Sequence, residues 1–362
     1  MAHLLAVGRA LPGPPRVQQE ITAAIGPLLT TDQDRLEALH RLHAASGVTS
    51  RHLVLPLEDY REVTSFGHAN DLFLREGRVL AEDVTRTALA AAGVAPEAVD
   101  FLLFTSVTGI SAPSIDAGLV EAVGLRPDVK RMPSFGLGCA GGAAGIARVH
   151  DYLAGHPDQV GLLVSVELCS LTVQSGDDST ANLVASGLFG DGAAAVLLVG
   201  QEHPLARGAG LEVLGTRSGL YPGTADQLGW RVRDSGFAIM LAAGLPATIR
   251  THLTGDIAVL LSAHGLTTAD VATWVVHAGG PRIFDAVTDA LDLSAEALAV
   301  SRASLSAVGN LSSASVLHVL ADTLQRTGPP CGVLPRRDRE PRRALTQLIR
   351  VLLRCCHDSH PP

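Results

Sequence analysis

A cysteine in a run of small residues is the first candidate for chemistry in this sequence. Cys139 has glycines close on both sides, and residues 143–153 are small and apolar enough to form a buried helix. A thiol at the start of a helix faces unpaired backbone N–H groups and the positive end of the helix dipole, which stabilise the thiolate and lower the pKa of the thiol. We therefore predict that Cys139 is a nucleophile, although a lone cysteine among glycines is more often an inert core residue.

His277 and Asn310 carry side chains that complement such a thiol. His277 ends an apolar run and precedes a glycine loop, a common position for active-site residues in layered sheets. Asn310 follows Gly309 and opens another run of small residues. Alone, the histidine would be structural and the asparagine a helix cap. With Cys139 they predict acyl transfer: the thiol takes an acyl group, and the imidazole and amide donate hydrogen bonds to an oxygen that gains negative charge beside a carbanion.

Two parts of the chain repeat the same order of residues. Residues 93–105 contain a glycine turn followed by an apolar strand, and residues 265–277 have the same order. The small residues 138–143 have a counterpart in 309–314. Such internal repetition indicates a duplicated βα unit, in which the cysteine and the asparagine occupy matching turns.

Continuous apolar runs such as residues 192–199 alternate with stretches of helical periodicity. This alternation is typical of an α/β fold whose strands are buried on both faces. Together with the repeat, it predicts two halves, residues 1–203 with the cysteine and residues 204–327 with the histidine and the asparagine. Residues 328–362 form a third, atypical segment.

The composition excludes several classes of protein. With 362 residues, 47% hydrophobic and 18% charged, the chain has the composition of a well-buried globular enzyme. The net charge is −8, and basic residues cluster only near the C-terminus, which argues against nucleic-acid binding. The five cysteines show neither metal-ligand spacing nor a disulfide framework, and no apolar run is long enough to span a membrane. We expect a cytoplasmic protein without a metal.

Four segments together resemble the type III polyketide synthases, the chalcone synthase-like enzymes of plants and bacteria. They are residues 138–145, Leu-Phe-Gly-Asp-Gly at 188–192, His-Ala-Gly-Gly-Pro at 277–281, and residues 309–314. The resemblance runs from the N-terminus to Thr327. It implies a thiolase-like five-layered αβαβα fold and a homodimer. It also implies loading of an acyl group from acyl-CoA, extension with malonyl-CoA by decarboxylative condensation, and closure to an aromatic ring or pyrone, with no cofactor besides the CoA thioester substrates.

The resemblance also implies roles for individual residues. Cys139 is the nucleophile, and His277 and Asn310 support decarboxylation and condensation. Further positions implied are the gatekeeper Phe189, the cavity-lining Glu167 and Thr172, and Arg51 at the CoA phosphates.

Two cavity positions depart from the family by carrying small residues. Ile239 stands where a second gatekeeper aromatic is usual, and Ala112 stands near the position that reaches across the dimer interface in the plant enzymes. Smaller side chains leave more room. We therefore hypothesise a long fatty acyl starter and an alkylresorcinol or alkylpyrone product.

The C-terminus departs further. After Thr327 the family implies a strand, a glycine-rich loop and a closing strand, but residues 329–343 are rich in proline and arginine. We expect no central strand from this C-terminal segment. An out-of-frame C-terminus is the favoured explanation, and a basic extension is the second.

Three alternative interpretations remain open on the sequence alone. A ketoacyl-carrier-protein synthase III would share the cysteine, histidine and asparagine but perform a single condensation. A catalytically impaired thiolase-fold protein would keep the fold and act as a dimer partner. A cysteine hydrolase would use the same thiol and imidazole but has no reason to duplicate its scaffold.

Overall fold

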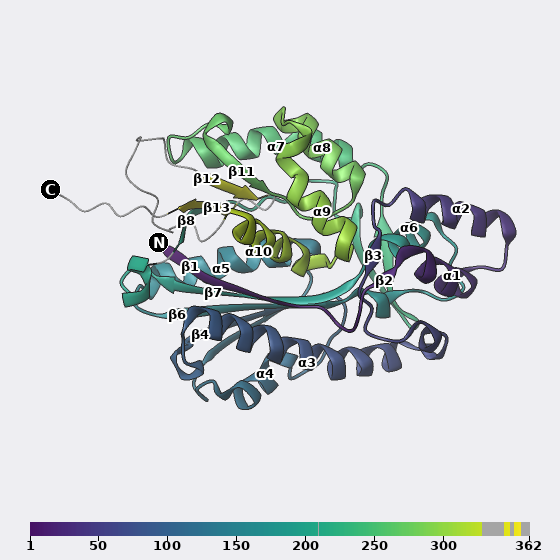
Figure 1. The fold of residues 1–362 in the computed structure, drawn as a ribbon, viewed down its shortest axis with the longest axis horizontal. Helices are drawn as coiled ribbons and strands as arrows, with labels where there is room; N and C mark the ends of the chain where they lie inside the picture. The colour runs from purple at the N-terminus through teal and green to yellow at the C-terminus, as the bar shows by residue number, and fades with distance from the viewer. Residues whose placement is uncertain (209, 328–343, 348–350, 356–362) are drawn as a thin grey trace.

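The computed structural model describes residues 1–208, 210–327, 344–347 and 351–355. Within them, nine strands form one curled sheet, with helices on its outer faces and between its two arms (Figure 1). The result is five alternating layers of helix and sheet, which is the predicted thiolase-like α/β fold. In sheet order the strands are β11 (Val271–Val275), β12 (Ala344–Gln347), β13 (Val351–Cys355), β8 (Leu211–Thr216), β1 (Ala2–Ala10), β7 (Asp191–Gly200), β6 (Val160–Leu168), β4 (Phe101–Thr105) and β5 (Lys130–Ser134).

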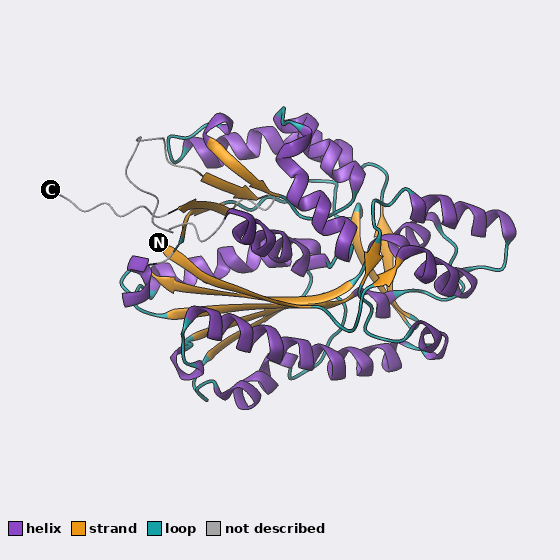
Figure 2. Cartoon of the chain, in the orientation of Figure 1, coloured by secondary structure: helices purple, strands orange, loops and turns teal. Residues whose placement is uncertain are grey.

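The helices form three layers and a group at one end of the molecule (Figure 2). The layers contain α3 (Phe66–Ala92) and α4 (Ile115–Leu119) on one outer face, α5 (Gly141–Gly155) and α10 (Ser315–Thr327) in the middle, with α9 (Ala299–Val308) packed against α10, and α7 (Leu245–Ser262) and α8 (Pro281–Leu291) on the other face. The end group contains α1 (Gln18–Leu29), α2 (Gln33–Ala44), α6 (Thr180–Leu188) and the short strands β2 (Arg16–Val17), β3 (Ser50–Arg51), β9 (Leu228–Arg233) and β10 (Gly236–Leu241). No helix of the described residues is both long and apolar enough to cross a membrane.

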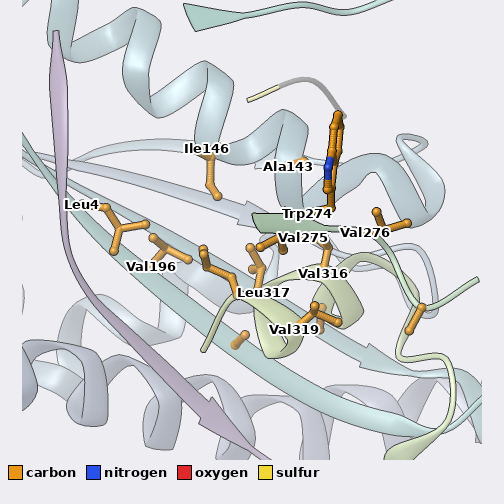
Figure 3. Close-up of a cluster of buried hydrophobic side chains, with 14 of the residues drawn as sticks. Leu4, Ala143, Ile146, Val196, Trp274, Val275, Val276, Val316, Leu317 and Val319 are labelled. Atoms are coloured by element: carbon orange, nitrogen blue, oxygen red, sulfur yellow. The ribbon is translucent and has the colours of Figure 1, made fainter. Parts of the chain in front are cut away.

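Strand β7 shows why the central strands have continuous apolar sequences. All its residues are buried, and successive side chains alternate between two hydrophobic clusters. Val196 packs in the same cluster as Leu317 of α10 (Figure 3), whereas Leu197 belongs to the cluster on the α3 side. A change such as Leu317→Ala in this cluster costs about 2–5 kcal/mol of stability. The predicted burial on both faces is confirmed.

The glycines after Cys139 serve close packing. A Cβ atom at Gly142 would lie 2.2 Å from the carbonyl oxygen of Ser313, and one at Gly145 would lie 2.5 Å from Leu163. Helix α5 can therefore approach both β6 and the turn before α10 only because these positions lack side chains. The glycine run thus joins the cysteine segment to the second half of the chain.

The repeat predicted from the sequence is visible in the order of the elements. A 3-10 turn, Pro96–Ala98, precedes β4, and another, Thr268–Asp270, precedes β11. Likewise the turn Gly138–Ala140 opens α5, and the turn Ser312–Ala314 opens α10. The two opened helices pack against each other in the middle layer.

The C-terminal strands correct one expectation. Strand β12 pairs in parallel with β11, and β13 pairs antiparallel with both β12 and β8, so the segment does supply central strands. The expectation was wrong because it weighed the proline and arginine content of the preceding stretch over the short apolar run of residues 351–353. That run gives β8 a backbone partner, so β8 is not left as an edge, and β12 gives a partner to β11. Residues 328–343, 348–350 and 356–362 lie outside the described residues, so the explanation of the unusual C-terminus stays a prediction.

Candidate active site

Cys139 lies in the 3-10 turn Gly138–Ala140, just before α5. Gly138 has a φ of 57°, in the left-handed region that favours glycine, and this lets the chain turn sharply into the helix. The cysteine is half-buried, and its Sγ donates a hydrogen bond of 3.7 Å to Ser312 Oγ. The thiol therefore contacts the matching turn of the second half.

Asn310 is held rigidly opposite the thiol. It is 3% exposed, and its Oδ1 accepts hydrogen bonds from Ser312 N at 2.8 Å and Ser315 Oγ at 3.1 Å. Because both of these groups donate, the side-chain atom they contact must be the amide oxygen. The amide nitrogen of Asn310 is therefore free to donate a hydrogen bond to another group. The Asn310 side chain hydrogen-bonds the thiol of Cys139 and so lowers its pKa. Of the three predicted residues, Cys139 and Asn310 are thus directly in contact.

His277 follows β11 and is half-buried. Burial lowers the pKa of its imidazole to about 4, so the ring is neutral at pH 7. Its Nδ1 has no hydrogen-bond partner among the described residues. The loop after it folds back at once, since Gly279 N donates to the His277 carbonyl at 2.8 Å.

The segment Leu188–Phe189 brings these three parts of the chain to one place. Asn310 N donates to the Leu188 carbonyl at 2.8 Å, and Leu188 also packs on Gly280, where a Cβ would lie 3.6 Å from its side chain. Phe189 packs in a small cluster with Cys139. The histidine loop, the asparagine turn and the cysteine turn therefore all adjoin two consecutive residues.

The pKa of the Cys139 thiol is opposite to expectation. It is raised to about 11: burial is the largest cause, the negative charge of Glu167 adds to it, and the hydrogen bonds with Ser312 and Asn310 only partly offset both. The prediction of a lowered pKa was wrong because it considered the helix terminus and not the loss of water around the thiolate. In the free protein the thiol is protonated at neutral pH.

Glu167 does not line the cavity as the resemblance implied. It is fully buried, and its carboxylate accepts hydrogen bonds from Val107 N at 3.2 Å, from Thr108 Oγ1 at 2.8 Å and from Ser313 Oγ. Burial raises its pKa to about 7. It acts on the site through its charge near the thiol and its bond to the turn before α10.

A small cavity lies behind Phe189 and Cys169, which both pack beside the thiol. Thr172 and Ile239 are among the residues that line it. The cavity is small: its volume is about 20 Å³, close to the room that one water molecule needs. The full lining is Ile21, Ile25, Arg51, Leu53, Tyr60, Cys169, Ser170, Thr172, Val173, Asn182, Ala185, Ser186, Phe189, Trp230 and Ile239.

Trp230 has the largest side chain among the lining residues that the sequence analysis did not name. It lies on β9 directly across from Ile239 on β10, and its ring centre is 6.3 Å from that of Phe189. The indole and the Ile239 side chain therefore line the cavity side by side. The available signal was the hairpin itself: two short strands around Asp234-Ser235-Gly236 place these residues opposite one another.

Arg51 and Ala112 differ from the roles that the resemblance implied. Arg51 is 2% exposed and bonded inside the protein, so it does not offer its guanidinium at the surface for CoA phosphates, contrary to our expectation. The strand pairing of β2 with β3 turns its side chain inward. Ala112 is exposed, on a loop where its bond to Pro113 is cis, and it is not part of the cavity lining in this chain.

Comparison with known proteins decides the family. Residues 1–203 match the N-terminal domain of the chalcone and stilbene synthases, and residues 213–328 match their C-terminal domain. The chain belongs to this family. It is therefore a type III polyketide synthase, an acyltransferase of the decarboxylating, condensing kind.

Individual relatives support the assignment over almost the whole synthase. The chain is 51% identical to 1,3,6,8-tetrahydroxynaphthalene synthase of Streptomyces peucetius subsp. caesius over 328 residues, which are 90% of this chain and 86% of the relative. It is 34% identical to a putative chalcone synthase of Bacillus subtilis, over 90% of this chain and 91% of the relative. The crystal structure of tetrahydroxynaphthalene synthase from Streptomyces coelicolor superposes with a TM-score of 0.87 at 31% identity, covering 99% of this chain and 100% of that one.

Proposed function

We propose that this synthase loads a small acyl group from its CoA thioester onto Cys139 and extends it with malonyl-CoA. In the loading step the thiol loses its proton, and its sulfur attacks the thioester carbonyl while the CoA thiol leaves. The imidazole of His277 is neutral, so it can take that proton and then pass it to the departing CoA sulfur, which leaves as a thiol. The contact of Asn310 with the thiol is the observation that carries this proposal.

The same residues support the condensation. Loss of carbon dioxide from malonyl-CoA leaves an enolate, whose negative oxygen accepts hydrogen bonds from the Asn310 amide and the His277 Nε2–H. The enolate carbon attacks the acyl group on Cys139, the sulfur leaves as thiolate, and the chain on CoA is two carbons longer. Fixing of Asn310 Oδ1 by Ser312 and Ser315 preorganises the amide for this task.

We further propose a small starter and a compact polyhydroxylated aromatic product of the tetrahydroxynaphthalene type. The 51% identity to a synthase of that name supports the product type, and the small cavity lined by Trp230 supports a small starter. A naphthalene has ten ring carbons, which five two-carbon units supply. The alkylresorcinol or alkylpyrone hypothesis needs room for a long chain, and the described cavity has little.

A substrate panel tests both parts of the proposal. Purified protein is incubated with malonyl-CoA alone and with acetyl-, hexanoyl- or palmitoyl-CoA plus malonyl-CoA, and products are identified by mass spectrometry. We expect an aromatic product from the small substrates and little turnover of palmitoyl-CoA. A single-condensation product from every substrate would indicate a ketoacyl synthase III-like enzyme, and no product would indicate an impaired protein.

A substitution sharpens the starter proposal. Trp230→Ala should admit longer acyl chains, with hexanoyl-CoA use rising relative to acetyl-CoA. The long-chain hypothesis predicts instead that Ala112→Phe or Ala112→Met shortens the accepted starters. Unchanged chain-length preference in Trp230→Ala would contradict the role of the indole.

We also propose that the synthase is a homodimer. Strand β5 ends the sheet, and Met132, Phe135 and Leu137 on and after it are exposed although apolar. An apolar sheet edge of this kind is typical of an interface between subunits. Sedimentation analysis should give twice the chain mass of 37.6 kDa. A monomer would contradict the proposal.

A further inference from the structure

A buried guanidinium forms one wall of the cavity behind Phe189. Arg51 is 2% exposed, its Nε donates to Gln18 Oε1 at 2.9 Å, and its Nη1 donates to the Phe189 carbonyl at 2.5 Å. Its Nη2 has no hydrogen-bond partner among the described residues, and Arg51 is the only arginine in the described lining of the cavity. Leaving such a donor without a partner in a protein interior is unfavourable. A ligand in the cavity would meet it.

The charge of Arg51 is balanced from a distance. Asp191 is fully buried, and its carboxylate accepts from Ser170 N at 2.8 Å, Ser170 Oγ at 2.5 Å and Val54 N at 2.7 Å. In the described residues no ion pair joins Arg51 to a carboxylate. The electrostatic interaction of Asp191 with Arg51 favours the charged form of each group. The guanidinium is thus a cation with a donor left over at the cavity.

The rest of the lining suggests what the guanidinium binds. Tyr60 also lines the cavity, and its hydroxyl shares a hydrogen bond of 2.5 Å with Ser170 Oγ, the same hydroxyl that donates to Asp191. Most other lining side chains are apolar. A group with one negatively charged oxygen on a small carbon chain fits this surface, because a guanidinium forms strong charge-assisted hydrogen bonds with such an oxygen. Cys139 adjoins the cavity through Phe189 and Cys169.

We propose that Arg51 binds an anionic oxygen of the acyl chain carried on Cys139. The oxygen belongs either to the carboxylate of a malonyl starter or to an enolate of the growing β-keto chain. In both cases the guanidinium holds the far end of the chain while its near end reacts. The inference rests on the proposed function and adds a binding residue that explains why a buried cation is placed there.

The first test compares variants of the whole enzyme. Arg51→Gln removes the charge, Arg51→Lys keeps it, and Arg16→Gln makes the same charge change at the position paired with Arg51 on the neighbouring strand, outside the cavity. Each protein receives malonyl-CoA alone, or acetyl-CoA with malonyl-CoA. Decarboxylation of malonyl-CoA and circular dichroism report whether the site and the fold are intact.

The two sources of the oxygen predict different patterns. If Arg51 binds a starter carboxylate, Arg51→Gln lowers product formation from malonyl-CoA alone by about 10- to 100-fold, as for loss of a charged hydrogen bond, and leaves acetyl-started synthesis within about twofold. If it binds an enolate, both reactions stop at short diketide or triketide products. Arg51→Lys should recover part of the loss, and Arg16→Gln should behave as wild type.

Other outcomes overturn the proposal. Equal loss at every step, decarboxylation included, would show a purely structural role, and unchanged products in both reactions would show none. A wild-type protein that makes no condensation product would refute the proposed function instead. Failure of the Arg51 proposal alone is recognised by an active wild type that the variants match.

A second test needs no variant, in case the Arg51 variants do not fold. Trp230 lines the cavity and is one of only two tryptophans, so its fluorescence reports on occupancy. Wild-type protein is titrated with malonate, with acetylacetone, which forms an enolate, and with neutral 2-pentanone. We expect a saturable change with malonate or acetylacetone and none with 2-pentanone. No response to either anion, or the same response to all three, would overturn the proposal.

Discussion

The two turns that open α5 and α10 have the same local architecture, but one carries a nucleophile and the other a hydrogen-bond donor, and these need different surroundings. Each contains or follows a glycine with positive φ, 57° at Gly138 and 74° at Gly309. Asn310 is locked by its backbone and by two donors on its amide oxygen, whereas Cys139 is half-buried with one long hydrogen bond from its thiol. An oxyanion donor must be held in place, and a nucleophile must be reached by substrate. The duplicated scaffold supplies both by varying burial.

The largest expected effect comes from removing the nucleophile, Cys139. Cys139→Ala should abolish acyl transfer, with loss of at least about 1,000-fold in product formation, because no other group can carry the acyl chain. Its stability should change by less than about 1 kcal/mol, because the side chain is only half-buried. Product assays and thermal melting measure the two. Residual polyketide synthesis would contradict the assigned nucleophile.

The substitution Asn310→Asp tests the role of the Asn310 amide as a hydrogen-bond donor. The carboxylate can still accept hydrogen bonds from Ser312 and Ser315, but it replaces the amide donor with an acceptor. Decarboxylation of malonyl-CoA should fall by about 100- to 1,000-fold, as for loss of an oxyanion donor. Ser315→Ala, the control, removes one donor to Oδ1 and keeps the amide, so it should lose far less activity. Equal losses would mean that orientation, and not donation, matters.

The thiol environment predicts a pH dependence. Because burial raises the pKa of Cys139 to about 11, its alkylation by iodoacetamide should accelerate about tenfold per pH unit from pH 7 to pH 10, as the thiolate fraction grows. Mass spectrometry of the modified peptide follows the rate. Glu167→Gln removes a charge that raises this pKa and should increase the rate at pH 8. A rate already at its plateau at pH 7 would support the lowered pKa that the helix start suggested.

The smallest effect concerns the packing between the turns. Gly142→Ala should lower stability by about 1–3 kcal/mol, because its Cβ would lie 2.2 Å from the Ser313 carbonyl oxygen. Gly155→Ala is the matched control at the end of the same helix, where a Cβ meets nothing within 4 Å, and should be neutral or slightly stabilising. Chemical denaturation measures both. Equal stability of the two variants would mean that the turns adjust independently.

The sequence alone determined the local parts of this protein. Apolar runs predicted the buried strands, the repeat predicted two matching turns, and the motifs around Cys139, His277 and Asn310 predicted the family, because these are patterns within short stretches of chain. Tertiary structure decided the thiol pKa, the burial of Arg51, the network around Glu167 and the position of Trp230 beside Phe189. It also placed β12 and β13 inside the sheet. These properties depend on water excluded and charges brought close by segments far apart in the chain, which no local pattern records.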